Sequence, residues 1–131
     1  MTPHTPQSGA WFPLGWGPSA PAEARGLARR LSAAHALQAA TRHRLLLVVS
    51  ELVSNAVQHG LPPVAIRISL GEDAIGVEVS DGSLTTPKPR SPTSGGLAVR
   101  GRGLGIVGTL SSDWGWRTQP PGKAVWCEVP R

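Results

Sequence analysis

A carboxylate and an amide are spaced so that they can share one face of a helix. Glu51 and Asn55 are four residues apart in segment 42–59, whose apolar residues recur with helical spacing. Residues four apart lie one turn apart on the same side of a helix. Carboxylate and amide oxygens can hold Mg²⁺ directly or through water, and Glu51 could accept a proton from an attacking hydroxyl group. The alternative is an ordinary solvent-facing helix surface.

An aspartate followed by a glycine comes at the end of a predicted strand. Asp81 and Gly82 follow the alternating segment 74–80, and such a pair is common in simple turns. The functional alternative is a carboxylate that accepts a hydrogen bond from an exocyclic amine such as adenine N6. The pair alone favours the turn.

A glycine-rich segment precedes a short apolar run. Gly101, Gly103 and Gly105 alternate with Arg102 and Leu104. Glycines let backbone N–H groups approach an anion closely, and a helix N-terminus favours negative charge. Arg102 could add a positive charge to such a phosphate site. The spacing is neither G-x-G-x-x-G nor that of a P-loop, so a flexible loop is the alternative.

Hydrophobic periodicity predicts the elements that must position these residues. Helical spacing predicts helices at 22–38 and 42–59, with Thr41 as the N-cap of the second. A short third helix is predicted at 103–110. Period-two alternation predicts a hairpin of strands at 64–70 and 74–80. A short edge strand is predicted at 10–14, where Pro13 would be tolerated, and a last hairpin at 113–118 with 123–129 around the turn 119–122. Separate helices and antiparallel hairpins indicate an α+β fold, a two-layer α/β sandwich.

Length and composition favour one globular domain. The chain has 131 residues, of which 40% are hydrophobic. We expect a flexible tail at 1–10 and a single domain at 11–131. No apolar run reaches the roughly 18 residues of a membrane span, and no signal-peptide pattern opens the chain. The single cysteine, Cys127, fits a reducing compartment, so a cytoplasmic protein is expected.

The basic charge balance admits several partners. The formal net charge is +5, which could suit a nucleic acid, an acidic partner or a bound polyphosphate. The arginines are dispersed rather than gathered in a block of like charges. Nucleic-acid binding is therefore not favoured, and a solvated basic surface is the plain alternative.

Taken in their order along the chain, these motifs resemble those of the GHKL ATPase superfamily, whose ATP site is called the Bergerat fold. The stretch 51–60 resembles the N box of the small bacterial anti-sigma-factor serine kinases. Residues 79–83 are similar to the first glycine box and residues 101–107 to the second. The ending, 113–116 with 122–126, resembles the closing hairpin, so the resemblance spans residues 11–130.

The resemblance implies a Mg-ATP site in a mostly antiparallel mixed sheet covered on one face by about three helices. Glu51 would be the general base or water-positioning group, Asn55 the Mg²⁺ ligand and Asp81 the adenine-binding residue. Segment 83–104 would be an ATP lid. The nucleotide-binding residues would be Asn55, Gln58, His59, Asp81, Gly82, Ser83, Gly101, Arg102, Gly103, Leu104 and Gly105.

The same resemblance implies an ATP-dependent serine/threonine kinase that phosphorylates or sequesters a small regulatory partner. That partner would be a sigma factor or an anti-anti-sigma-like antagonist, and the chain would form a homodimer. The alternative is a catalytically inactive, ATP-responsive binding module. Two departures from the family pattern favour this alternative. Ser83 and Leu84 stand where a further small residue is usual, and Ala124 replaces a threonine that supports the adenine-binding aspartate.

Overall fold

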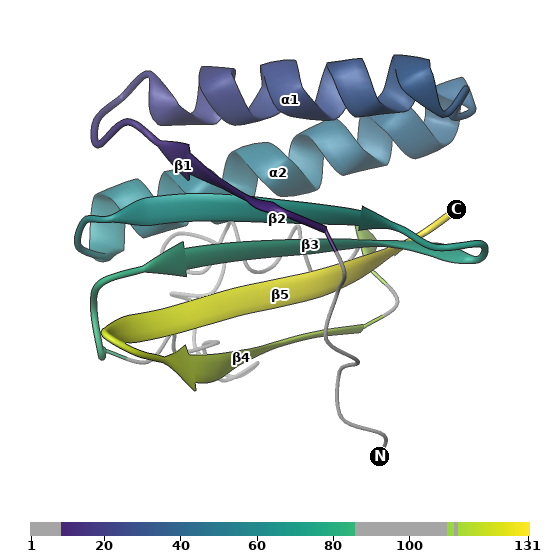
Figure 1. The fold of residues 1–131 in the computed structure, drawn as a ribbon. Coiled ribbons are helices and arrows are strands. Elements are labelled where there is room, and N and C mark those ends of the chain that lie inside the picture. Colours follow the sequence, from purple (N-terminus) through teal and green to yellow (C-terminus); the bar gives the residue numbers. More distant parts are fainter. Residues whose placement is uncertain (1–8, 86–109, 112) are drawn as a thin grey trace, which may run out of the picture.

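In the residues that the structure describes, the fold is a two-layer sandwich of one sheet and two helices (Figure 1). The computed structural model describes residues 9–85, 110–111 and 113–131. Its elements are β1 (Trp11–Leu14), α1 (Ala20–Ala34), α2 (Ala39–His59), β2 (Val64–Leu70), β3 (Ala74–Asp81), β4 (Asp113–Gln119) and β5 (Gly122–Pro130). The strand order is β1-β2-β3-β5-β4, and every neighbouring pair is antiparallel. The predicted α+β sandwich is therefore confirmed.

The core lies between the helices and one face of the sheet. Successive side chains of a strand point to opposite faces, so the alternating apolar residues of the three central strands gather on one side. Helix α2 contributes a continuous buried stripe to the same core. The fully buried large side chains of this layer include Leu45, Val48, Val49, Val53, Val64, Ile66, Ile75, Val77, Val79 and Val129.

Two predicted elements differ from the structure or lie beyond it. The third helix predicted at 103–110 lies outside the described residues except for Leu110. The tail predicted at 1–10 is described only from Gly9, whose N–H donates to the Ser69 hydroxyl. No helix in the described part of the chain is both long and apolar enough to cross a membrane.

Helix α1 ends earlier than its apolar spacing predicts. It spans Ala20–Ala34 rather than 22–38. Ala36 has a φ of 50°, and the Leu37 N–H reaches back to the Ser32 carbonyl at 3.0 Å. This is the hydrogen-bond pattern of a Schellman helix end. Leu37 remains buried although it lies beyond the helix, so its apolar character reflects core packing rather than helical continuation.

The start of α2 also differs from the prediction. Thr41 was expected to be the N-cap, but the helix begins at Ala39, and Gln38 holds the N-cap position without a capping side-chain bond. Thr41 lies in the first turn and is buried. Its hydroxyl accepts a bond from the Arg44 guanidinium at 3.4 Å. The helix therefore extends past Thr41 because this side chain packs into the core rather than capping the helix.

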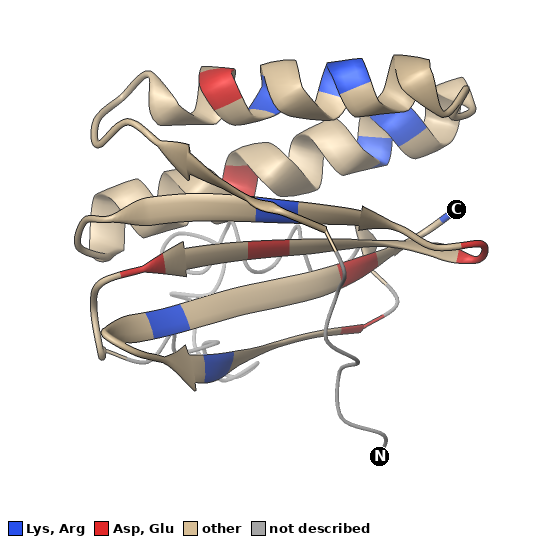
Figure 2. Ribbon diagram, in the orientation of Figure 1, with Lys and Arg blue, Asp and Glu red and all other residues tan. Residues whose placement is uncertain are grey.

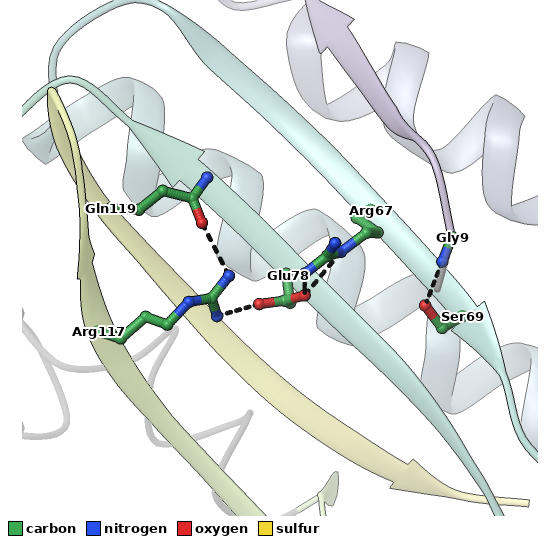
Figure 3. Close-up of polar contacts among 6 residues, drawn as sticks. All are labelled: Gly9, Arg67, Ser69, Glu78, Arg117 and Gln119. Atoms are coloured by element: carbon green, nitrogen blue, oxygen red, sulfur yellow. Dashed lines mark hydrogen bonds and ion pairs between the residues drawn. The ribbon is translucent and has the colours of Figure 1, made fainter. Parts of the chain in front are cut away.

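The other face of the sheet carries an ionic cluster around a buried glutamate (Figure 3). Glu78 is completely buried and accepts hydrogen bonds from Arg67 and Arg117. Arg67 also lies 4.6 Å from the Trp11 ring centroid, and Arg117 donates to Gln119 at 2.8 Å. Figure 2 shows basic residues on β2 and β4 and acidic residues on β3, which lies between those two strands in the sheet. Charge-assisted hydrogen bonds thus join β2, β3 and β4, and the cation–π contact of Arg67 with Trp11 adds β1.

The single cysteine is a protonated core residue. Burial raises the pKa of the Cys127 thiol from 9.0 to about 12, a hydrogen bond with Ser111 acts in the opposite direction, and the Glu128 charge raises it further. The folded-state pKa of this thiol lies above its unfolded value. The contribution of the protonated thiol to the free energy of unfolding is therefore complete below pH about 9 and is lost as pH rises toward 12.

This shift predicts a thiol that is unreactive in the native protein. At pH 8 the disulfide reagent DTNB should leave native Cys127 unmodified and react readily after urea unfolding. Between pH 9 and 12 the free energy of unfolding should fall by up to about 1.4 kcal/mol per pH unit from this group. A Cys127→Ala variant, measured in parallel, should lack that component. Rapid native modification at pH 8 would contradict the assignment.

Candidate functional site

The end of helix α2 packs directly against the end of strand β3. A Cβ atom placed on Gly60 would lie 2.5 Å from the Asp81 Cγ. The Gly82 N–H donates to the Leu61 carbonyl at 2.6 Å, and a Cβ on Gly82 would lie 2.3 Å from the Pro62 carbonyl oxygen. Two motifs that are separate in the sequence therefore form one junction, and glycine permits the close approach on both sides.

The closeness of this junction predicts the effect of adding one methyl group. Gly60→Ala would push against both the Asp81 carboxylate and the Ala56 carbonyl oxygen, 2.6 Å from the new Cβ. We expect a loss of about 1–3 kcal/mol in the free energy of unfolding, measured by urea denaturation. The matched control is Gly26→Ala, where the nearest atom is Arg30 Nη1 at 3.6 Å. That change should stabilise α1 by up to about 1 kcal/mol, so equal losses in both variants would contradict the packing argument.

The Asp81 carboxylate is held by two donors. The Ser83 N–H donates to Oδ1 at 2.7 Å, which forms an Asx-turn. The Lys123 ammonium donates to Oδ1 at 3.1 Å and to Oδ2 at 3.0 Å. The side chains of Lys123 and Asp81 are only 8% and 3% exposed. Figure 2 shows the acidic end of β3 beside the basic start of β5. The site therefore contains a fixed, charge-compensated carboxylate.

The structure corrects the expectation that residue 124 supports Asp81. Ala124 is paired with Ser80, whereas Lys123 is paired with Asp81. Because neighbouring side chains of a strand point to opposite faces, a hydroxyl at position 124 would face away from the Asp81 carboxylate. The absence of a hydroxyl at Ala124 therefore does not weaken the site.

Lys123 was missed by the sequence reasoning. The sequence contains one sign of its position: Lys123 alternates with Val125 and Cys127, so all three lie on the helix-facing side of the last strand. What the pattern did not supply was the register that puts Lys123 opposite Asp81. The carboxylate and its cationic partner are 42 residues apart in the chain.

Helix α2 presents Glu51 and Asn55 one turn apart. Both are half-buried, whereas Gln58 and His59 are exposed near the helix end. Within the described residues, neither Glu51 nor Asn55 makes a side-chain hydrogen bond or ion pair. With a rise of about 1.5 Å per residue, Asn55 lies roughly 7.5 Å along the helix from Gly60. The two side chains thus lie further along α2 than the junction of Gly60 with Asp81.

A comparison with protein families decides what kind of domain this is. The family model described as a histidine kinase-like ATPase domain matches residues 18–128. The chain belongs to this family. The match takes in both helices and the positions of Asp81 and Lys123, which lie opposite each other on the neighbouring strands β3 and β5. None of the curated proteins compared matches the chain.

Membership of the histidine kinase-like ATPase family supports ATP binding and a regulatory role. It agrees with the resemblance to GHKL ATPases drawn from the motifs, at the level of the domain. Of the predicted site residues, the structure describes those on α2 and those at the Asp81 junction. The predicted phosphate-binding residues Gly101, Arg102, Gly103, Leu104 and Gly105 lie outside the described residues, as does the predicted lid beyond Thr85.

The polar groups of the ATPase domain suit a magnesium held mainly by nucleotide and water. In the described ranges, no group of three or more His, Cys, Asp or Glu could hold a metal. Magnesium is commonly bound through one or two protein oxygens together with substrate phosphates. The Asn55 amide and the Glu51 carboxylate one turn away, which make no side-chain bond to any described residue, fit that requirement.

Proposed function

We propose that this ATPase domain is an ATP-dependent serine/threonine protein kinase of the anti-sigma-factor type. ATP would bind with its base at Asp81 and its phosphates extending along α2 toward Asn55 and Glu51. The observation that supports this orientation best is the junction of Gly60 with Asp81. The Asp81 carboxylate lies at the end of α2, and Asn55 and Glu51, which make no side-chain bond to any described residue, lie further along the helix.

The base end of the proposed site rests on the Asp81 carboxylate. A buried acceptor held by the Ser83 N–H and Lys123 cannot turn away from its ligand. An exocyclic amine that donates to this carboxylate would satisfy its remaining acceptor capacity. Adenine carries such an amine, and this match is the chemical reason for placing the base here.

The phosphate end of the proposed site rests on Asn55 and Glu51. The amide oxygen of Asn55 would be the protein ligand of Mg²⁺, which neutralises phosphate charge when it is bound. Glu51 lies one turn further from the base, about 6 Å along the helix. From there its carboxylate would accept the proton of the attacking hydroxyl group or orient that group. Gln58 and His59 would serve at the edge of this region, since both are exposed.

Calorimetric titration tests the proposed nucleotide site. We expect the wild-type domain to bind ATP in the presence of Mg²⁺, and an Asn55→Ala variant to lose at least about tenfold in affinity through the missing metal ligand. The control is Ser54→Ala, which removes a neighbouring half-buried polar group from a different face of α2 and should bind like wild type. Failure of the wild type to bind Mg-ATP, or unchanged affinity in Asn55→Ala, would contradict the proposal.

The partner is proposed on the resemblance rather than on a contact in the structure. A small regulatory protein, either a sigma factor or an anti-anti-sigma-like antagonist, would supply the serine or threonine or be sequestered. Incubation of such candidates with radiolabelled ATP and the domain should transfer label to one of them. If ATP binds and a candidate is captured without transfer, the domain acts instead as an ATP-responsive binding module. Light scattering of the same samples tests the proposed homodimer.

A further inference from the structure

Lys123 lies beside the carboxylate that would meet the nucleotide base. We propose that Lys123 is a specificity-determining residue, which reads the base together with Asp81 as a donor next to an acceptor. The inference rests on the proposed function, since it concerns how the same nucleotide site chooses its base. It assigns a role to a residue that the motif resemblance leaves without one.

First, the ion pair of Lys123 with Asp81 does not use all of their hydrogen-bond donors and acceptors. A lysine ammonium has three N–H donors and a carboxylate has about four acceptor positions. Lys123 directs its two bonds to the same carboxylate, and Asp81 is its sole partner in the part of the chain that is described. The Ser83 N–H takes another position on Oδ1. Within the described ranges, one lysine donor and one acceptor position on Oδ2 therefore remain, on two atoms that lie 3.0 Å apart.

The second step is burial. The side chains of Lys123 and Asp81 are 8% and 3% exposed, so little water can serve the remaining donor and acceptor. A bound base that offers no partner to the remaining donor or acceptor would leave a charged group desolvated and unsatisfied, and this lowers its affinity. Sites of this kind discriminate strongly against analogues that lack one hydrogen-bonding atom.

The third step is the chemistry of the base. On its Watson–Crick edge adenine presents the N6 amino donor directly next to the N1 acceptor. The free position on Asp81 Oδ2 suits the N6–H group, and the free Lys123 N–H suits N1. Because the donor carries a full positive charge, its bond to N1 is stronger than one from a neutral hydroxyl. A six-membered ring without N1 would place a C–H group against the ammonium.

The test compares three nucleotides by calorimetry in the wild-type domain. ATP carries both groups, 1-deaza-ATP lacks the N1 acceptor, and 7-deaza-ATP changes only the opposite edge of the base. We expect 1-deaza-ATP to bind at least about tenfold more weakly than ATP, and 7-deaza-ATP to bind within about twofold of it. Equal binding of ATP and 1-deaza-ATP would overturn the role of Lys123 while leaving the proposed function intact.

Substitution of the lysine then separates recognition from structure. Lys123→Met should weaken ATP about tenfold and should bind ATP and 1-deaza-ATP within about twofold of each other. A purely structural lysine would lower affinity for all three nucleotides by the same factor and would keep their ratio. Wild-type affinity in Lys123→Met, or an unchanged ratio, overturns the inference. The control Arg42→Met removes the same charge from an exposed position on α2 and should leave every affinity unchanged.

Loss of ATP binding in Lys123→Met could also result from unfolding, and loss of binding in the wild type would concern the proposed function as well. Circular dichroism establishes whether Lys123→Met is folded; if it is not, the analogue series in the wild-type protein decides by itself. If the wild type binds none of the three nucleotides, the proposed function and this inference both fail. That outcome differs from binding of ATP without discrimination, which overturns Lys123 alone.

Discussion

Asp81→Asn is expected to lower the affinity of the domain for ATP by at least about a hundredfold, a loss of roughly 3 kcal/mol. The asparagine keeps the size of the side chain but replaces one acceptor oxygen with an NH₂ donor. That donor would face either the Lys123 ammonium or the Ser83 N–H, which now bind the carboxylate at 3.0–3.1 Å and 2.7 Å. It also removes the negative charge to which an adenine amine would donate.

The same substitution should destabilise the fold. Lys123 is nearly buried and would lose its only ionic partner within the described residues. Removing one member of a buried pair commonly costs about 3–5 kcal/mol in unfolding free energy, which urea denaturation would measure. The domain could then fail to bind ATP simply because it is unfolded.

The double variant Asp81→Asn with Lys123→Met distinguishes these causes. Replacing both members leaves no unpaired buried charge, so stability should return to within about 1–2 kcal/mol of wild type. The affinity for ATP should stay at least about a hundredfold below wild type, because the carboxylate acceptor is still missing. Recovery of wild-type ATP affinity in the double variant would show that Asp81 serves only the fold.

Glu51→Gln is expected to abolish phosphoryl transfer while leaving ATP binding unchanged. A glutamine cannot take the proton of an attacking hydroxyl group, and loss of a general base typically costs about 10²–10⁴ in rate. The side chain is half-buried and has no hydrogen-bonding partner among the residues described, so folding should tolerate the isosteric change. The rate is measured as label transferred to the partner protein, and the affinity by calorimetry.

The specificity of the Glu51→Gln effect can be checked with a glutamate far from the proposed site. Glu72→Gln removes the same charge from the exposed turn between β2 and β3 and should leave both rate and affinity as in wild type. Undiminished transfer in Glu51→Gln would exclude Glu51 as the base. Partner regulation that survives in Glu51→Gln cells would instead favour an ATP-responsive binding module.

Much of the fold could be predicted because each helix and strand has a hydrophobic pattern that repeats every two to four residues. The alternation of Val64, Ile66 and Ile68 indicates a strand with one buried face, and that face packs against the helices. The ends of the helices were less predictable. At the end of α1 an alanine, Ala36, adopts the left-handed conformation, where glycine is the usual signal. The position of Thr41 inside α2 likewise follows from its burial rather than from its capping preference.

The candidate site divides along the same line. The sequence by itself determined that Glu51 and Asn55 share a helix face, because their four-residue spacing and the helical period are local properties. It also marked Asp81 at a strand end. Only the tertiary structure decided that Gly60 lies against Asp81, and that Lys123 rather than Ala124 supports the carboxylate. These contacts depend on strand register and on packing between distant segments, and a one-residue change of register would turn Lys123 to the opposite face.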